Sequence, residues 1–200
     1  MQRRLARFIV AFAACALCMP PLFAANAAKT RDFAKRAMAA TGFTLGRAGP
    51  LIVSFEDPNC MFCERLSRET APLVQAGKLR VRVVPVAFLK PDSLGRAAAI
   101  LQARHPAAAW ERNMAQFHHA QEEGGYPVAS VTFTSDRALR ANRALLEQGS
   151  GQLATPTLLI CAKGSDTPVL RSGISSQALH SLLQGAGSVT PSGGCSAASP

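Results

Sequence analysis

Beyond its first 27 residues, the sequence lacks an apolar run long enough to cross a bilayer and any run of three or more Lys or Arg residues. The first absence argues against an internal membrane span. The second argues against a nucleic-acid-binding tail, although the formal net charge is +10. Three arginines fall within the first 27 residues, so the remaining chain carries about +7. We interpret this charge as a basic, solubilising surface and predict no nucleic-acid partner.

The first 27 residues have the pattern of a secretory signal peptide. Their apolar segment, 8–19, is too short to span a membrane comfortably. The positive region before it consists of Arg3, Arg4 and Arg7. Ala25-Asn26-Ala27 is a small-x-small cleavage site, so we expect a signal peptide at 1–27. The bacterial style of the pattern predicts export to a Gram-negative periplasm, with an uncleaved anchor, or a lipoprotein formed through Cys15 or Cys18, as alternatives.

The exported chain would keep four cysteines but only one closely spaced pair, Cys60 and Cys63. An even number of cysteines in an oxidising compartment is typical of disulfide chemistry. A zinc site needs a second close pair, and Cys161 and Cys195 lie too far apart in sequence to provide it. A haem-attachment motif needs His after the second cysteine, where Glu64 stands. We therefore predict a redox-active pair with no metal and no cofactor, and keep metal binding and a structural disulfide as alternatives.

The cysteine pair lies where a predicted strand meets a predicted helix. Residues 50–55 form an apolar run typical of a buried strand, and apolar residues recur at helical spacing between 66 and 77. A helix start offers unpaired backbone N–H groups and the positive end of the helix dipole, and both favour a thiolate. We therefore expect Cys60 to have a lowered pKa and to be the attacking sulfur. Cys63, one turn further on, would resolve the mixed disulfide.

The order of the other predicted elements is typical of an α/β fold. A helix at 29–40 precedes the first strand, and the further elements are strands at 79–88, 157–161 and 168–172 and helices at 93–104, 106–123, 135–148 and about 175–183. Ser93, Ser135 and either Ser175 or Ser176 are the expected N-caps. We predict a linker helix and connector (28–49) and a thioredoxin-like α/β domain (50–184). A helical insertion at about 91–150 would separate the second strand from the third, and a flexible tail rich in Gly, Ser and Pro (185–200) would follow.

A proline at the start of a strand, Pro156, has no N–H to donate to its neighbour. We explain it by a cis Thr155–Pro156 peptide that turns the chain beside the cysteine pair and exposes backbone to a client. Thr155 would then contact the sulfurs or the client.

Together these motifs resemble the catalytic domain of the periplasmic DsbC/DsbG-type disulfide isomerases, and the DsbG branch in particular. The matching residues are Phe55, Asp57-Pro58, Cys60, Cys63, Pro85-Val86, Lys90-Pro91-Asp92-Ser93, Ala97 to Leu101, Pro106, Trp110 and Thr155-Pro156. The resemblance spans 29–183 and implies a thioredoxin fold, with Cys60 as nucleophile, Cys63 as resolving cysteine and Pro156 as the cis-proline. It also implies client proteins with cysteines and a membrane redox partner that resets the dithiol.

The chain departs from this family in three places. The family's N-terminal dimerisation domain has no counterpart before the helix at 29–40, so we expect a monomer. Met61-Phe62 keeps only the aromatic half of the dipeptide that the family has between its cysteines. Ser54 stands six residues before Cys60, where thioredoxins place a buried carboxylate. Glu56 or Asp57 could relay protons instead, or both could be exposed turn acids.

The second pair of cysteines invites a structural disulfide. Cys161 ends a predicted strand, and Cys195 lies on a tail that can fold back to it. Two free thiols, or an intermolecular link through Cys195, remain open.

The sequence thus predicts an exported thiol–disulfide oxidoreductase that reduces or isomerises client disulfides, or reduces client sulfenic acids. Cys60 would attack, Cys63 would release the client, and the strand edge near Pro156 would hold the client backbone. The alternatives are a monomeric dithiol oxidase, a client-binding chaperone, and a metal-handling module.

Overall fold

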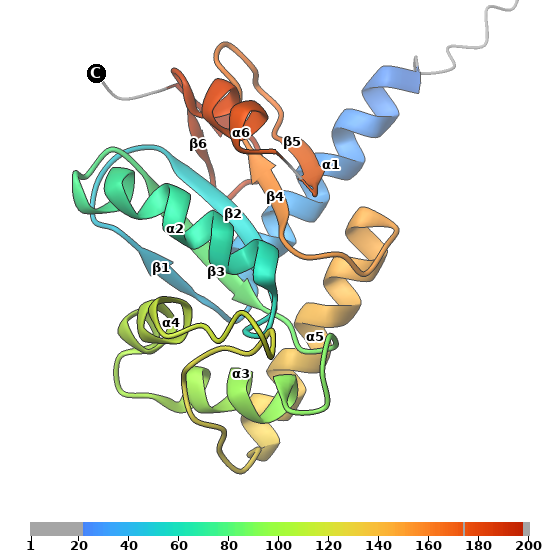
Figure 1. Ribbon diagram of the computed structural model, residues 1–200. Coiled ribbons are helices and arrows are strands. Elements are labelled where there is room, and N and C mark those ends of the chain that lie inside the picture. The colour runs from blue at the N-terminus through green and yellow to red at the C-terminus, as the bar shows by residue number, and fades with distance from the viewer. Residues whose placement is uncertain (1–21, 174, 198–200) are drawn as a thin grey trace, which may run out of the picture.

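The computed structural model describes residues 22–173 and 175–197 (Figure 1). Most of the predicted signal peptide, residues 1–21, therefore lies outside the described residues. Across the described ranges, no helix combines the length and the apolar character that a membrane crossing requires.

The centre of the fold is a five-stranded mixed sheet in the order β1-β3-β2-β4-β5. The strands are β1 (Phe43–Leu45), β2 (Leu51–Glu56), β3 (Arg80–Pro85), β4 (Thr157–Ile160) and β5 (Val169–Ser172). Strands β2 and β3 are parallel, whereas β4 runs antiparallel to both β2 and β5. A parallel unit followed by an antiparallel hairpin confirms the predicted arrangement. Strand β1 was not predicted: it occupies the expected connector and pairs antiparallel with β3.

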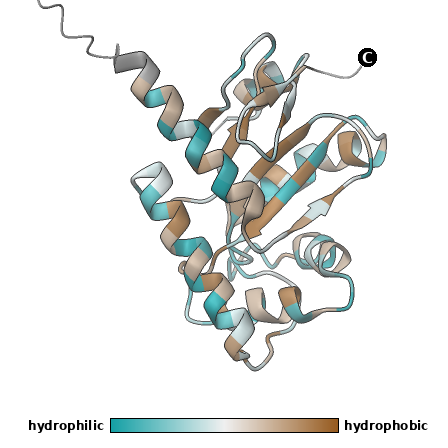
Figure 2. Cartoon of the chain, turned by 180° about the vertical axis from the view of Figure 1, so that it is seen from behind, coloured by the Kyte–Doolittle hydropathy of each residue, from teal (hydrophilic) through white to brown (hydrophobic). Residues whose placement is uncertain are grey.

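Helices cover both faces of this sheet (Figure 1). They are α1 (Leu22–Ala39), α2 (Met61–Gln75), α3 (Ser93–Gln102), α4 (Pro106–Ala115), α5 (Phe133–Ser150) and α6 (Ser176–Leu183). Buried residues of α1 and α5 pack in one core cluster with β2, β3 and β4. Buried residues of α2, α4 and α6 pack in a second cluster on the other face. The apolar strands are therefore sandwiched, and the outward faces of α1 and α5 carry polar residues (Figure 2).

Alternation along β2 decides which of its side chains lie on the same sheet face as α2. Ile52 belongs to the cluster that contains α2, whereas Val53 and Phe55 belong to the cluster that contains α1 and α5. Successive strand residues point to opposite faces, so Ser54 and Glu56 lie on the same face as α2. All six β2 residues are buried.

Two of the predicted N-caps are wrong, because neighbouring polar residues take the cap positions. Asp92 precedes α3, and the Ser93 hydroxyl donates instead to Asp57 Oδ1 at 2.8 Å. Thr132 caps α5, with Ser135 as the second member of a capping box. Ser175 caps α6, as one of the two predicted alternatives. Helix α4 ends at Ala115, eight residues before the expected end, and the chain continues as turns.

The prediction of a flexible tail at 185–200 is wrong for residues 185–197, which the structure describes. Residues 185–197 contain a small two-stranded sheet of β6 (Ser188–Val189) and β7 (Cys195–Ser196). Val189 is buried, and the Leu51 backbone N–H donates to Ser188 Oγ at 3.0 Å. Gly193, at φ +84°, lets this segment approach α1 so closely that a Cβ would lie 2.0 Å from the Arg31 carbonyl oxygen. The glycines that made the tail look disordered thus permit its packing.

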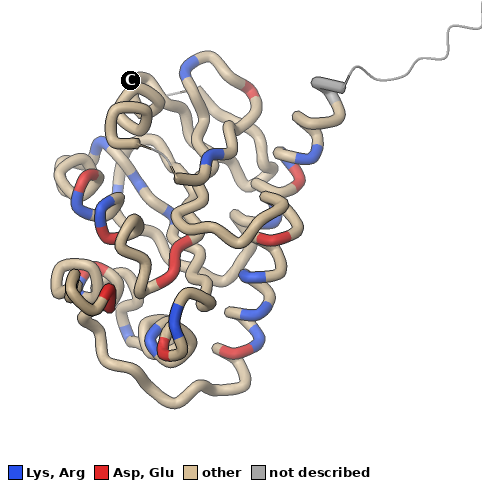
Figure 3. The backbone as a smooth tube through the Cα atoms, turned by 45° about the vertical axis from the view of Figure 1, so that its right-hand side comes forward, with Lys and Arg blue, Asp and Glu red and all other residues tan. Residues whose placement is uncertain are grey.

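Helix α1 begins seven residues before the predicted start, so the predicted cleavage site lies within it. Its Phe33 ring stacks on Phe55 of β2, with ring centroids 5.3 Å apart. Basic and acidic residues are interspersed over several elements (Figure 3), in keeping with the solubilising surface that we expected.

Candidate redox site

Cys60 sits at the junction of β2 and α2, as its N-cap residue, with extended backbone angles (φ −86°, ψ 112°). Its sulfur accepts a hydrogen bond from the Cys63 backbone N–H at 3.2 Å. Helix N-caps accept from the free N–H groups of the first turn, and here the acceptor is a sulfur. Both cysteines are buried and are not bridged to each other.

The two thiols face opposite electrostatic conditions. The pKa of Cys60 is lowered by hydrogen bonds from the Cys63 thiol and the Thr155 hydroxyl and from backbone N–H groups, against the opposing effect of burial. Burial raises the pKa of Cys63 well above its usual value, and the nearby Cys60 and Glu56 raise it further. Of the two sulfurs, Cys60 is therefore the one that ionises more readily, and Cys63 is the one that keeps its proton.

The Thr155–Pro156 peptide bond is cis and lies beside the cysteine pair. The Cys60 thiol donates to the Thr155 carbonyl oxygen at 3.4 Å. Thr155 Oγ1 is buried and has no hydrogen-bond partner among the described residues, so the hydroxyl is available to a Cys60 thiolate, and its nearness lowers the Cys60 pKa. The structure thus brings Cys60, Cys63, Thr155 and Pro156 together.

A pocket of about 280 Å³ adjoins the cis-proline. Its lining includes Phe62, Leu66, Pro156 and Leu179. Phe62, between the two cysteines, is 58 % exposed, whereas Leu66 and Leu179 are buried. Arg65 and Glu69 also line the pocket, which offers a mainly apolar surface next to the cis-proline. A larger cavity of about 630 Å³ lies on another side of α2, against Met114 of α4, and contains none of the predicted site residues.

Glu56 and Asp57 are both buried, so the alternative that they are exposed turn acids is wrong. Asp57 accepts hydrogen bonds from the backbone N–H groups of Phe88 and Leu89, at 2.8 and 3.1 Å. Glu56 Oε2 has no partner among the described residues. Burial raises the pKa of Glu56 to about 8, and the nearby Ser54 hydroxyl partly opposes this rise. Glu56 is therefore the carboxyl that is free to exchange a proton near Cys63.

One polar residue next to the site was not singled out in the sequence. Asn59, directly before Cys60, is buried and bonds to residues of α3 and of the segment after α4. The available signal was an amide side chain between Asp57-Pro58 and Cys60, at a position where a buried strand ends.

Cys161 and Cys195 are joined by a disulfide, with Cα atoms 5.6 Å apart. It links the end of β4 to β7 and is separate from the Cys60–Cys63 pair.

The fold and the site together define a thioredoxin-like protein with a cysteine pair at a helix start and a cis-proline beside it. In a comparison of structures, the chain resembles a periplasmic thioredoxin-like protein from Salmonella enterica serovar Typhimurium, with a TM-score of 0.55 and 23 % identity. That match covers 72 % of this chain and 88 % of the other. It supports the predicted fold class.

In sequence, the chain is similar to the thiol:disulfide interchange protein DsbG of two bacteria. It is 32 % identical to the Pseudomonas aeruginosa protein over 120 residues, which is 56 % of this chain and 43 % of that protein. It is 39 % identical to the Escherichia coli K12 protein over 64 residues, which is 32 % of this chain and 26 % of that protein. No protein-family model matches.

The chain thus spans less than half the length of the two curated relatives. Over that part the chain is similar in sequence to proteins of the DsbG type, in line with the resemblance that the residues around Cys60 and Pro156 carry, and its fold is thioredoxin-like.

Proposed function

We propose that this chain is an exported thiol–disulfide oxidoreductase that reduces or isomerises disulfides of client proteins. The observation that carries the proposal is the contrast between two thiols three residues apart. Cys60, with its lowered pKa, lies at the start of α2 beside the cis-proline, and Cys63, with its raised pKa, lies one turn deeper. The similarity to DsbG supports the activity, and the leader pattern supports a periplasmic location.

In the first step, the Cys60 thiolate attacks one sulfur of a client disulfide. A Cys60–client bond forms, the client bond breaks, and the second client sulfur leaves as a thiolate that takes up a proton from water. A client sulfenic acid would react similarly and release water. The pocket at Phe62 and Pro156 would hold apolar client side chains, and the exposed backbone near Pro156 would pair with the client backbone.

In the second step, Cys63 loses its proton and attacks Cys60. Because burial holds Cys63 in the thiol form, it needs a proton acceptor. The ionised form of Glu56, on the same sheet face as α2, can serve, because its pKa of about 8 lies close enough to neutral pH for the group to take up and release a proton. The Cys60–Cys63 disulfide forms and the client leaves as a thiolate, so the pair loses two electrons and the client gains them. Attack by a second client thiol on the mixed disulfide instead gives isomerisation. A membrane redox partner would reduce Cys60–Cys63 again.

A trapping experiment tests this order of attack. Cys63→Ser should accumulate a mixed disulfide between Cys60 and a disulfide-bonded client, at least about tenfold above wild type, because no second thiol resolves it. Cys60→Ser is the matched control and should trap almost nothing. Non-reducing gels and mass spectrometry would measure both. Equal trapping through Cys60 and Cys63 would contradict the proposed order.

The same preparations separate the other candidate functions. A Cys60→Ala/Cys63→Ala variant that still prevents client aggregation as well as wild type would indicate a chaperone. Metal that copurifies with the reduced wild-type protein, and not with the double variant, would indicate a metal-handling module. Size-exclusion chromatography with light scattering tests the proposed monomer.

A further inference from the structure

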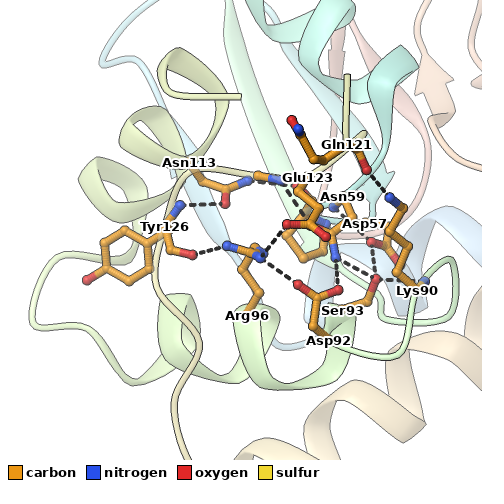
Figure 4. Close-up of polar contacts among 12 residues, drawn as sticks. Asp57, Asn59, Lys90, Asp92, Ser93, Arg96, Asn113, Gln121, Glu123 and Tyr126 are labelled. Atoms are coloured by element: carbon orange, nitrogen blue, oxygen red, sulfur yellow. Dashed lines mark hydrogen bonds and ion pairs between the residues drawn. The ribbon is translucent and has the colours of Figure 1, made fainter. Parts of the chain in front are cut away.

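The loop that precedes Cys60 is held by side chains and backbone of the helical block, by which we mean the segment between β3 and β4 that contains α3, α4 and α5 (Figure 4). Asn59 makes three of these contacts. Its side-chain Nδ2 donates to Asp92 Oδ1 at 2.8 Å and to Ser93 Oγ at 3.1 Å, and its Oδ1 accepts from the Gly124 backbone N–H at 3.0 Å. Its own backbone N–H donates to Asp57 Oδ1 at 3.0 Å. Every polar group of the residue next to Cys60, apart from its carbonyl, is thus engaged.

The two residues before Asn59 are tied to the same block. Asp57 accepts from the Ser93 hydroxyl at 2.8 Å, in addition to the backbone N–H groups of Phe88 and Leu89. The Pro58 carbonyl oxygen accepts from Asn113 Nδ2 of α4 at 2.9 Å. The redox loop 57–59 therefore has partners on α3, on α4 and in the turns that follow each of β3 and α4.

Gly124 makes this contact possible by its lack of a side chain. A Cβ at this position would lie 2.2 Å from Asn113 Oδ1 and 2.5 Å from the Pro58 carbonyl oxygen. Both distances are well below van der Waals contact, and one of the two atoms is backbone. Any larger residue would push the segment after α4 away from the redox loop.

Ion pairs hold the outer side of the same network (Figure 4). Arg96 of α3 is largely buried and pairs with Asp92 at 2.5 Å and with Glu123 at 3.9 Å. It also donates to the Tyr126 carbonyl oxygen. One oxygen of the Asp92 carboxylate thus accepts from Asn59, and the other pairs with Arg96. The ion pair with Arg96 therefore holds the carboxylate in place for Asn59.

We propose that Asn59 is a positioning residue for the redox centre: it joins the segment around Gly124 and the start of α3 to the backbone that leads into Cys60. This inference rests on the proposed function and deepens it. The helical block would then act on the chemistry as well as cover the sheet, because it holds Cys60 in the N-cap geometry where the Cys63 N–H reaches its sulfur. The hydrogen bonds of Asn59 go to Asp57, to the start of α3 and to Gly124 and not to a sulfur, so Asn59 would act through the position of Cys60.

We call the hydrogen bonds of Asn59 to Asp92, Ser93 and Gly124 the loop clamp. Loss of this clamp should weaken the stabilisation of the Cys60 thiolate. If the loop relaxes, the sulfur moves out of line with the N–H groups at the start of α2, and a thiolate there loses part of its hydrogen bonding. The pKa of Cys60 then rises. A stabilised Cys60 thiolate stabilises the reduced form of the pair. When that stabilisation is lost, the disulfide form becomes more stable relative to the reduced form.

The test compares two buried asparagines in the full-length protein. Asn142 of α5 is the matched control: it is 2 % exposed, like Asn59, and its Nδ2 donates to the carbonyl oxygens of Thr41 and Pro85 at 2.9 and 2.8 Å. The first readout is the pH dependence of Cys60 alkylation by iodoacetamide in the reduced protein. The second is the equilibrium constant with glutathione.

We expect Asn59→Ala to raise the pKa of Cys60 by about half a unit to one unit and to shift the equilibrium constant about threefold to tenfold toward the disulfide, at most about 30 mV in potential. Asn142→Ala should lower the free energy of unfolding by a similar amount and leave both readouts unchanged. Gly124→Ala retains every side chain of the clamp and should move both readouts in the same direction as Asn59→Ala. If Asn59→Ala does not fold, the Gly124→Ala variant serves as the test of the positioning role.

An unchanged Cys60 pKa in the folded Asn59→Ala or Gly124→Ala variant, with a reactive wild-type protein, would overturn the positioning role alone. Equal shifts in Asn142→Ala would overturn it as well, because any loss of stability would then suffice. A wild-type Cys60 that is no more reactive than an ordinary thiol would overturn the proposed function, and the positioning role with it.

Discussion

The two cysteines of this site differ in pKa because they lie at different places on the first turn of one helix. Cys60 meets the unpaired N–H groups at the start of α2, and Cys63 is enclosed by apolar residues behind it. The first position favours charge and the second disfavours it. The buried Glu56 carboxyl is the third ionisable group of this arrangement, and its effect can be measured.

Glu56 should make the stability of the protein depend on pH. Its pKa is about 8 in the folded protein and 4.5 in an exposed carboxyl, so between these values the unfolded chain binds fewer protons. The free energy of unfolding therefore falls as the pH rises from 4.5 to 8, with a ceiling of about 5 kcal/mol for this one group. Glu56→Gln removes this effect, so its stability relative to wild type should rise by a few kcal/mol (roughly 2–4) between pH 5 and pH 8.

Urea unfolding of both proteins at several pH values measures this difference. Glu147→Gln, an exposed carboxyl on α5, is the control and should show no such trend. Glu56→Gln should also slow the release of a client from Cys60 by about tenfold or more at neutral pH, since Cys63 loses its proton acceptor. A stability difference that does not depend on pH would contradict the buried, proton-exchanging state of Glu56.

At the level of elements, the pieces that flank the cysteines were the most predictable. The apolar run that forms β2 and the helical spacing of α2 are local signals, and both elements appear within a few residues of their expected bounds. The same holds for the hairpin of β4 and β5. Strands β2 and β4 are buried along their whole length and α2 buries one face, so their apolar patterns reflect their structure.

Other elements depend on contacts that the sequence does not display. Strand β1 has three residues and exists because β3 offers it a free edge. The sheet of β6 and β7 depends on the Cys161–Cys195 disulfide and on close approaches at glycine, and its composition resembles that of a disordered tail. The role of Asn59 depends on Gly124, which is 65 residues away in sequence.

The Cys161–Cys195 disulfide should contribute strongly to stability. It closes a loop with a sequence separation of 34, for which chain entropy gives about 3–4 kcal/mol. A Cys161→Ala/Cys195→Ala variant should lose roughly 2–4 kcal/mol of unfolding free energy in urea, and β6 and β7 should lose protection from hydrogen exchange. The alkylation pH profile of Cys60 should not change. A shift of that profile would contradict the separation of the structural disulfide from the redox pair.

For the molecule as a whole, a three-layer α/β domain presents one reactive face. The ends of β2, α2 and β4 meet at the cysteines and the cis-proline, and the α3–α4 block lies next to the loop before Cys60 (Figure 1). The predicted fold class follows from the order of the elements, which is a property of the whole chain. The roles of Glu56 and Asn59 depend on which polar atoms are buried and which partners they find, and the sequence does not show this. Only the structure therefore shows that Asp57 is hydrogen-bonded while Glu56 Oε2 has no partner among the described residues.

The measurement that tests the central claim most directly is an equilibrium redox titration of Cys60 and Cys63, with free thiols counted by mass after alkylation. The Cys161–Cys195 disulfide should stay closed throughout, while the Cys60–Cys63 pair titrates as one two-electron couple between about −120 and −270 mV. A value near the first end indicates an oxidant, and a value near the second a reductant. A pair that stays closed, or stays open, at every potential would contradict a redox-active centre at Cys60 and Cys63.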